Sequence, residues 1–150
     1  MIHTLLKLNY LVVLGVAVAG FLLGSLWYSP LLFAKAWMKE MGLTPKDCQG
    51  GKSKMVMMLG STFVLTFVST AVLAVLVSEH QLIAEGAPSL GLVGGAKVGL
   101  FVGAGLVATR QCVNHLFSMK SWKLFLIVTG HDIVLCTLQG ALLGQFLWPK

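Results

Sequence analysis

The sequence predicts an all-α membrane protein, with four transmembrane helices and a short interfacial amphipathic helix after the first. Three observations lead to this prediction. Hydrophobic residues make up 57% of the chain and charged residues 11%, whereas soluble domains have roughly half and a quarter. Apolar runs of about 20 residues recur, which is enough to cross a hydrocarbon core of about 30 Å. Basic residues gather in two of the predicted loops, as they do in multi-pass membrane proteins.

The chain is expected to form a single domain over residues 1–150, because apolar runs and short polar loops alternate along its whole length. Its first run follows Lys7 and imitates a cleavable signal peptide, but it continues to Trp27, which favours an uncleaved span. The predicted spans lie at about residues 5–27, 54–77, 90–109 and 122–147, and the interfacial helix at about residues 30–41.

A Ser-Pro step separates the first span from the interfacial helix. Ser29 is a good N-cap, and Pro30 is tolerated at the first helical position, where its missing N–H costs nothing. In the helix that follows, apolar side chains share one arc while Lys35 and Lys39 point the other way. This pattern is typical of a helix that lies at the membrane surface. Gly42 is the expected end of that helix.

Aromatic residues stand near the predicted ends of the spans. Because amphipathic rings prefer the headgroup level of a bilayer, these residues are expected to anchor the helices at the two interfaces. The predicted anchors are Trp27, Tyr28, Trp37, Trp122 and Trp148.

Small residues mark the expected helix contacts. Four glycines recur at every fourth position of the third span and form a smooth ridge, a glycine zipper. Another backbone is expected to pack against it, either in the same chain or in a partner. The fourth span has a shorter seam of this kind, and the first has one more pair. The positions are Gly91, Gly95, Gly99 and Gly103, then Gly140 and Gly144, then Gly20 and Gly24.

The orientation follows from the distribution of basic residues. The predicted loops at residues 28–53 and 110–121 carry lysine or arginine, whereas the loop at residues 78–89 carries neither. Loops rich in these residues stay in the cytoplasm. We therefore expect loops 28–53 and 110–121 to be cytoplasmic and both termini to lie on the opposite side of the cell (inner, or cytoplasmic) membrane.

The segment around the Ser-Pro step also carries a resemblance. Its pattern is made by Gly24, Trp27, Tyr28, Ser29, Pro30, Leu32, Phe33, Lys35 and Trp37, with an echo in Asn114, Phe117 and residues 121–127. On these residues the chain resembles the domain-of-unknown-function family 1761, over essentially its whole length. The resemblance implies a small multi-pass membrane protein and transfers no catalytic residue or cofactor.

Three ionisable residues lie inside predicted spans, where a lone charge at the bilayer centre costs about 2.5–3.5 kcal/mol. They are Lys97 in the third span, and His131 and Asp132 in the fourth. Counting about 1.5 Å per residue puts Lys97 and Asp132 at similar depths, so that they are expected to pair if their helices are neighbours. Gln139 shares a helical face with Asp132, while His131 projects about 100° away.

Two interpretations of these polar residues stay open at this point. In the structural one, Lys97 and Asp132 form a pair that sets the register of two helices, and His131 bonds a backbone carbonyl. In the functional one, Lys97, His131, Asp132 and Gln139 line a polar path, and a histidine beside a carboxylate exchanges protons near neutral pH. Hydroxyls of the second span would join that path, from Thr62, Thr66 and Ser69.

Other classes of function find little support. The chain has no metalloprotease, hydrolase or phosphate-loop motif, so we do not expect an enzyme. Its three cysteines lack metal-ligand spacing, and we expect neither a metal nor a cofactor. The net charge of +6 is divided between loops, which argues against nucleic acid. His115, with Arg110 and Asn114 nearby, would suit a lipid phosphate, although a solvated loop explains these residues equally well.

The sequence therefore indicates a non-enzymatic integral membrane protein. The function that it favours is transport of a small solute or ion, or transport linked to protons, by an oligomer. The alternative is a structural or accessory subunit of a membrane complex. The expected partners are membrane lipids and either further copies of the chain or a larger membrane complex, because four thin spans leave limited room for an internal pathway.

Overall fold

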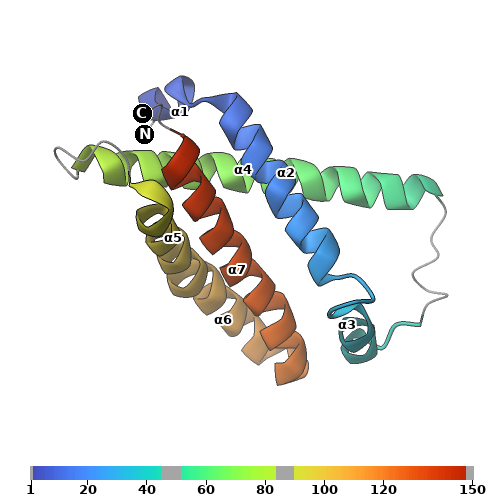
Figure 1. Ribbon diagram of the computed structural model, residues 1–150. Coiled ribbons are helices and arrows are strands. Elements are labelled where there is room, and N and C mark those ends of the chain that lie inside the picture. Colours follow the sequence, from blue (N-terminus) through green and yellow to red (C-terminus); the bar gives the residue numbers. More distant parts are fainter. Residues whose placement is uncertain (1, 45–51, 84–89, 148–150) are drawn as a thin grey trace.

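The computed structural model describes residues 2–44, 52–83 and 90–147, and every regular element in these ranges is a helix (Figure 1). The chain order is α1 (Ile2–Lys7), α2 (Tyr10–Trp27), α3 (Ala34–Met41), α4 (Lys52–Ile83), α5 (Gly91–Val102), the π-helical turn η1 (Gly103–Val107), α6 (Ala108–Ser118) and α7 (Trp122–Phe146).

Four helical segments are long and apolar enough to cross a membrane. They are Tyr10–Trp27, Ser53–His80, Gly91–Ser118 and Trp122–Phe146. The third consists of α5, η1 and α6 joined end to end, with η1 as the kind of π-helical bulge that long helices contain. The predicted fold class, an all-α membrane protein with four spanning helices, is confirmed.

The first span begins later than predicted. Residues 5–27 were expected to form one helix, but α1 ends at Lys7 and α2 begins at Tyr10. Asn9 is the reason, because its side-chain oxygen accepts hydrogen bonds from the amides of Leu11 and Val12, at 3.2 and 3.4 Å. This is an N-cap, and it starts a new helix at that position.

The interfacial helix α3 begins at Ala34, not at Pro30 as predicted. Ser29 does not cap it. Instead the Ser29 carbonyl accepts the amides of Leu32 and Ala34, at 3.1 and 3.2 Å, and its hydroxyl accepts the amide of Leu31. These bonds form a compact turn between α2 and α3. The predicted end of the helix is confirmed, since Gly42 takes the left-handed conformation, with φ of 69°.

Two helices extend beyond their predicted ends. α4 continues to Ile83, through residues that were expected to start a loop. The third span continues to Ser118, so the loop predicted at residues 110–121 is reduced to residues 119–121. There Met119 turns the chain with φ of 52°, and the Ser121 hydroxyl caps α7 by accepting the Leu124 amide. The polar residues of α6 had suggested a loop, but they lie on an amphipathic helix.

The closest packing in the fold joins α5 to α7. Gly95, Gly99 and Gly103 lie against α7 so closely that an added Cβ has no room, whereas a Cβ at Gly91 would meet nothing within 4 Å. A Cβ at Gly95 would lie 2.9 Å from Cα of Gly144, and one at Gly99 would lie 3.0 Å from Cα of Thr137. The neighbour of this ridge is thus in the same chain. Such small-residue contacts allow van der Waals packing that a lipid-facing helix lacks.

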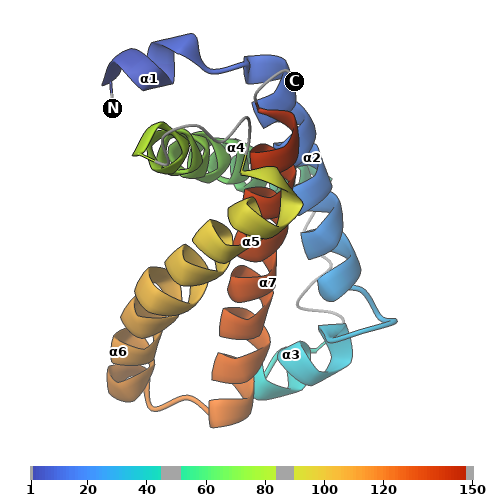
Figure 2. The same cartoon turned by 60° about the vertical axis from the view of Figure 1, so that its left-hand side comes forward.

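The other two spans flank this pair. α2 lies beside α7, and α4 runs across both, as Figure 1 and the view in Figure 2 show. The crossing buries the second half of α4, where Thr70, Ala74 and Val77 are fully enclosed. Ala74 and Val77 belong to an apolar core with Val13 of α2 and Leu143 of α7. The first half of α4, residues 53–62, is exposed along its length.

Candidate functional site

The predicted polar residues do not form one path. His131 and Asp132 belong to a network between α6 and α7. Gln139, two turns further along α7, is 2% exposed, and its amide donates a 2.7 Å hydrogen bond to Thr70 of α4. Lys97 is exposed on α5 and belongs to neither group. The structure therefore separates four residues that helical spacing alone had placed together.

The hypothesis of a Lys97–Asp132 pair is wrong, because the two side chains form no ion pair in the structure. Gly95 and Gly99, on either side of Lys97, lie level with Gly140. Asp132 is eight residues from Gly140 along α7, or about 12 Å at 1.5 Å per residue. The depths in the membrane that were estimated by counting residues were wrong because the third span continues to Ser118. Lys97 is therefore farther from the α6–α7 turn than the predicted loop implied.

In the network around Asp132, two side chains bond its carboxylate and a third, Thr129, bonds one of these two. The Thr129 hydroxyl donates to the Gln111 amide oxygen at 2.7 Å. The Gln111 amide nitrogen then donates to Oδ2 of Asp132, and Oδ1 lies 2.7 Å from Nδ1 of His131. Both carboxylate oxygens therefore take part in hydrogen bonds within the protein.

The two ring nitrogens of His131 are in different situations. Because Oδ1 of Asp132 accepts from Nδ1, Nδ1 carries the proton and Nε2 holds a lone pair in the neutral ring. Nε2 is buried and has no hydrogen-bond partner among the described residues. The side chain as a whole is 12% exposed. The expected bond from His131 to a backbone carbonyl is replaced by the bond to its neighbour Asp132.

Aromatic rings from the end of α2 enclose His131. Tyr28 and Trp27 place their ring centroids 5.2 and 5.9 Å from the imidazole. The Trp27 indole N–H donates to the carbonyl of Ile127 at 3.1 Å, and Trp37 packs against Tyr28. Burial, and after it the Asp132 carboxylate, raises the pKa of Tyr28 to about 12, so the phenol stays protonated.

The aromatic residues of the turn thus have a role that the sequence did not indicate. Trp27 and Tyr28 were predicted as membrane-interface anchors, and each is only partly exposed because it packs on α7. The exposed Trp122 packs against His115 and Phe125 at the start of α7. Trp148 lies outside the described residues. The Ser-Pro segment, expected only to orient the chain, therefore supplies part of the site.

Replacing Trp27 by phenylalanine tests the contact between the turn and α7. The ring stays, but the bond to the Ile127 carbonyl is lost, and the free energy of unfolding is expected to fall by about 0.5–1.5 kcal/mol. Denaturation in mixed detergent micelles, followed by circular dichroism, measures this change. Trp122→Phe is the matched control, because Trp122 is 58% exposed. An equal loss in both variants would show that the indole N–H of Trp27 has no special role.

A cleft opens beside His131, between α2, α4 and α7, and we call it the α2–α4–α7 cleft. Its volume is about 410 Å³. Gly24 lies directly against the imidazole, since a Cβ there would lie 3.3 Å from Nε2. The lining residues are Gly20, Phe21, Gly24, Ser25, Tyr28, Leu59, Thr62, Thr66, His131 and Leu135. Thr62 and Thr66 were predicted for a polar path, whereas Ser69 does not line the cleft.

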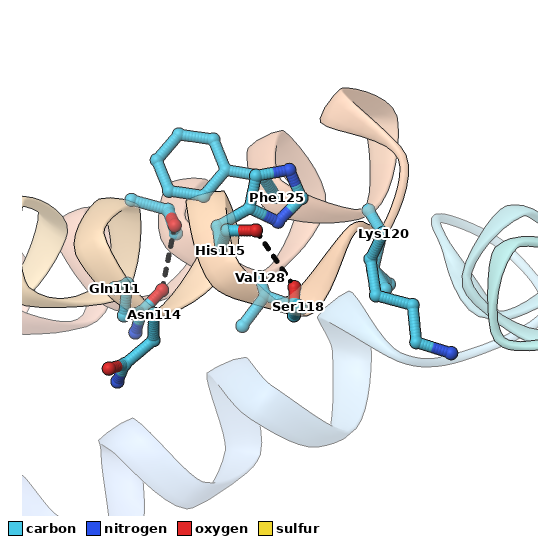
Figure 3. Close-up of a pocket in the computed structure, with 9 residues that line it drawn as sticks. Gln111, Asn114, His115, Ser118, Lys120, Phe125 and Val128 are labelled. Atoms are coloured by element: carbon cyan, nitrogen blue, oxygen red, sulfur yellow. Dashed lines mark hydrogen bonds between the residues drawn. The ribbon is translucent and has the colours of Figure 1, made fainter.

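A second hollow, of about 240 Å³, lies between α6 and α7 near their connecting turn (Figure 3). His115 lies there against Phe125, with ring centroids 5.0 Å apart, and Asn114 and Lys120 also line it. Figure 3 shows the Lys120 ammonium directed away from the imidazole. Arg110 is not among the lining residues. The basic and amide groups that suggested a lipid phosphate site therefore do not converge.

Sequence reasoning missed Gln111, Thr129 and Thr70. Gln111 fell in a predicted loop, and only its place on α6 brings it to Asp132. Thr70 follows Thr66 by one helical turn, and its hydroxyl donates to the Thr66 carbonyl at 2.7 Å. The four-residue spacing from Thr66 is a sequence signal that could have identified Thr70 as a member of the polar stripe. Among the described residues, no group of three or more His, Cys, Asp or Glu side chains is placed to hold a metal ion. Cys112 and Cys136 are free thiols, and Cys48 lies outside the described residues.

Comparisons with known proteins give one match. Neither the curated proteins nor the solved structures include a significant match to this chain. A family model described as "Protein of unknown function (DUF1761)" matches residues 11–144, which include nearly all of the four spans and the His131–Asp132 network. The chain therefore belongs to the DUF1761 family.

Proposed function

We propose that this protein is a proton-linked carrier of a small solute, with His131 and Asp132 as its proton-binding site. The observation that carries the proposal is the state of the His131 ring. Its Nδ1 is held by Asp132, while its Nε2 is buried without a hydrogen-bond partner among the described residues, and the side chain lines the α2–α4–α7 cleft. A histidine beside a carboxylate gains and loses a proton near neutral pH. Polar groups of this kind inside a membrane are costly and mark ion or proton pathways.

The surroundings suit proton exchange at Nε2. Asp132 stabilises the protonated ring, and Tyr28 is the other titratable group that faces it. Gln111 and Thr129 hold the carboxylate in place without adding charge. A proton that enters the cleft can therefore be accepted at Nε2 while Nδ1 keeps its bond to Asp132.

Reconstitution in liposomes tests the proposal. With a pH-sensitive dye enclosed, an imposed proton gradient combined with a mixture of candidate solutes is expected to give a proton flux above that of protein-free liposomes. Asp132→Asn and His131→Phe are expected to reduce the flux to the protein-free rate. Lys97→Gln is the control, since Lys97 lies on the exposed surface of α5. Flux that persists in both site variants would rule out this proton site.

A structural or accessory role is the second candidate, and one observation favours it. The hydrogen bonds from Thr129 to Gln111 and from Gln111 to Asp132 join α6 to α7, and both are formed within the protein. If these hydrogen bonds serve only to fix the register of α6 against α7, the wild-type protein is expected to conduct no protons. Gln111→Leu is then expected to lower the midpoint of unfolding. Wild-type proton flux that survives Gln111→Leu would favour the carrier.

We further propose that the turn between α6 and α7 and the segment between α2 and α4 face the cytoplasm. The lysines and arginines concentrated there support this orientation. Single cysteines at Lys120 and at His80, in a chain without its own cysteines, test it with a membrane-impermeant thiol reagent. Labelling of the Lys120 position from outside intact cells would contradict the proposal.

We propose that the working form is an oligomer, because the first half of α4 has few contacts within the chain. Its apolar side chains are exposed, as in Met57, which is 67% exposed, and Val56, which is 69% exposed. Mass measurement in detergent micelles and in nanodiscs tests this. A single chain in both would contradict it.

A further inference from the structure

Three groups that line the α2–α4–α7 cleft present hydrogen-bond acceptors. The Ser25 hydroxyl donates its proton to the Phe21 carbonyl at 2.9 Å, and the Thr62 hydroxyl donates to the Met58 carbonyl at 2.8 Å. Each of these oxygens therefore has lone pairs left for a ligand. Nε2 of His131 adds a third acceptor. A ligand that donates hydrogen bonds satisfies these three acceptors, and the Tyr28 and Thr66 hydroxyls, which also line the cleft, can donate or accept.

The charge behind the cleft is negative. Asp132 accepts from a neutral amide and from the neutral form of His131, so neither cancels its charge. Lys97 lies about two helical turns away on the exposed face of α5, and no described lysine or arginine pairs with Asp132. Because a low dielectric strengthens such fields, a cation in the cleft is favoured over a neutral molecule.

The remaining walls are apolar. Leu59 and Leu135 line the cleft with the rings of Phe21 and Tyr28, and aromatic faces attract cations. The volume of about 410 Å³ falls within the range of about 300–1,000 Å³ for small-molecule pockets. Gly24 also lines the cleft and lies against the imidazole, since a Cβ there would lie 3.3 Å from Nε2.

We propose that the cleft binds a small protonated organic amine with an apolar body, whose ammonium group donates to Nε2 of His131 and is attracted by Asp132. This assignment rests on the proposed carrier function and names the class of its solute. Nε2 has one lone pair, so a proton and an ammonium group exclude one another there. The amine and the proton would therefore be carried in exchange, in opposite directions.

Nitrogen NMR on protein labelled at its histidines tests the binding step in nanodiscs, at about pH 8, where a free imidazole is neutral. Four probes of the same shape are compared: 2-phenylethylamine, 2-phenylethanol, ethylbenzene and phenylethyl-trimethylammonium. The amine is expected to shift the Nε2 signal of His131, which is identified by its loss in His131→Asn. The other three should shift it much less, and the His115 signal should not respond. An equal response to the quaternary ammonium ion or to the alcohol would overturn the assignment.

Gly24→Val separates the cleft from the polar network. The added side chain fills the space beside Nε2 and removes no hydrogen-bonding group, so amine binding is expected to be lost while the bond between His131 and Asp132 remains. Gly15→Val is the matched control on the same helix, because an added Cβ at Gly15 meets nothing within 4 Å. Undiminished amine binding in Gly24→Val would place the ligand elsewhere.

The carrier and the amine site can fail separately. Amine-driven proton release from liposomes supports both. If the amine shifts the His131 signal but drives no proton flux, the amine site stands and the carrier function is wrong. If a solute mixture drives proton flux while the amine leaves His131 unchanged, the carrier stands and the amine assignment is wrong.

Discussion

Gly95→Ala is expected to cost about 3 kcal/mol of unfolding free energy, the upper end of the usual range for overpacking. The new methyl group would overlap the carbonyl group of Gly140 and lie 2.9 Å from Cα of Gly144. Both neighbours are backbone atoms, which cannot rotate away as a side chain can. α5 and α7 must therefore separate along their contact, and the close packing that joins them is lost.

Denaturation of the purified protein in mixed micelles measures this loss. Gly140→Ala is expected to have a similar effect, because its methyl group would meet Cα of Gly99 at 2.9 Å. Gly15→Ala and Gly60→Ala serve as controls, since nothing lies within 4 Å of an added Cβ at either position. If Gly95→Ala were as stable as these controls, α5 and α7 would not pack through this ridge.

Thr70→Val is expected to lower the unfolding free energy by about 1–2 kcal/mol. Thr70 is fully buried, and its hydroxyl oxygen accepts the Gln139 amide at 2.7 Å. Valine keeps the volume but leaves the buried amide without that acceptor. The loss is larger than the mean for hydrogen bonds between membrane helices, because Gln139 is 2% exposed and has little access to another partner.

A double-mutant cycle isolates this bond. Thr70→Val combined with Gln139→Leu removes both partners, so the double variant is expected to be more stable than the sum of the two single losses predicts. Ser69→Ala is the neighbouring control, because the Ser69 hydroxyl is exposed and donates only to the Thr66 carbonyl. Additive losses would show that the Thr70–Gln139 bond does not join α4 to α7.

Helix ends were harder to predict than helices. The apolar runs predicted four spans, but Asn9 started α2 by capping it, and α6 carried the third span past Arg110. The two errors were opposite: Asn9 was placed inside a continuous helix, whereas the polar residues of α6 were assigned to a loop. Composition alone does not distinguish a polar residue that caps a helix from one that lies on the polar face of a helix. Their difference lies in the backbone and in the neighbour that the polar face meets.

The candidate site was predicted in part. His131 and Asp132 were identified because ionisable groups inside a span are costly. Their partners were not, since Gln111 comes to Asp132 only through the length of α6 and the turn before α7. The paired charges expected from depth alone did not form, because depth depends on where each helix ends.

The sequence by itself determined the membrane character, the four spans, the glycine positions and the ionisable residues, because these depend on local composition and on helical spacing. Only the tertiary structure decided that the glycine ridge packs on α7, and that Trp27 and Tyr28 enclose His131. It also decided that Gln139 bonds α4 and not Asp132. Each of these depends on which helices are neighbours and at what register, and that is set by contacts between residues far apart in the chain.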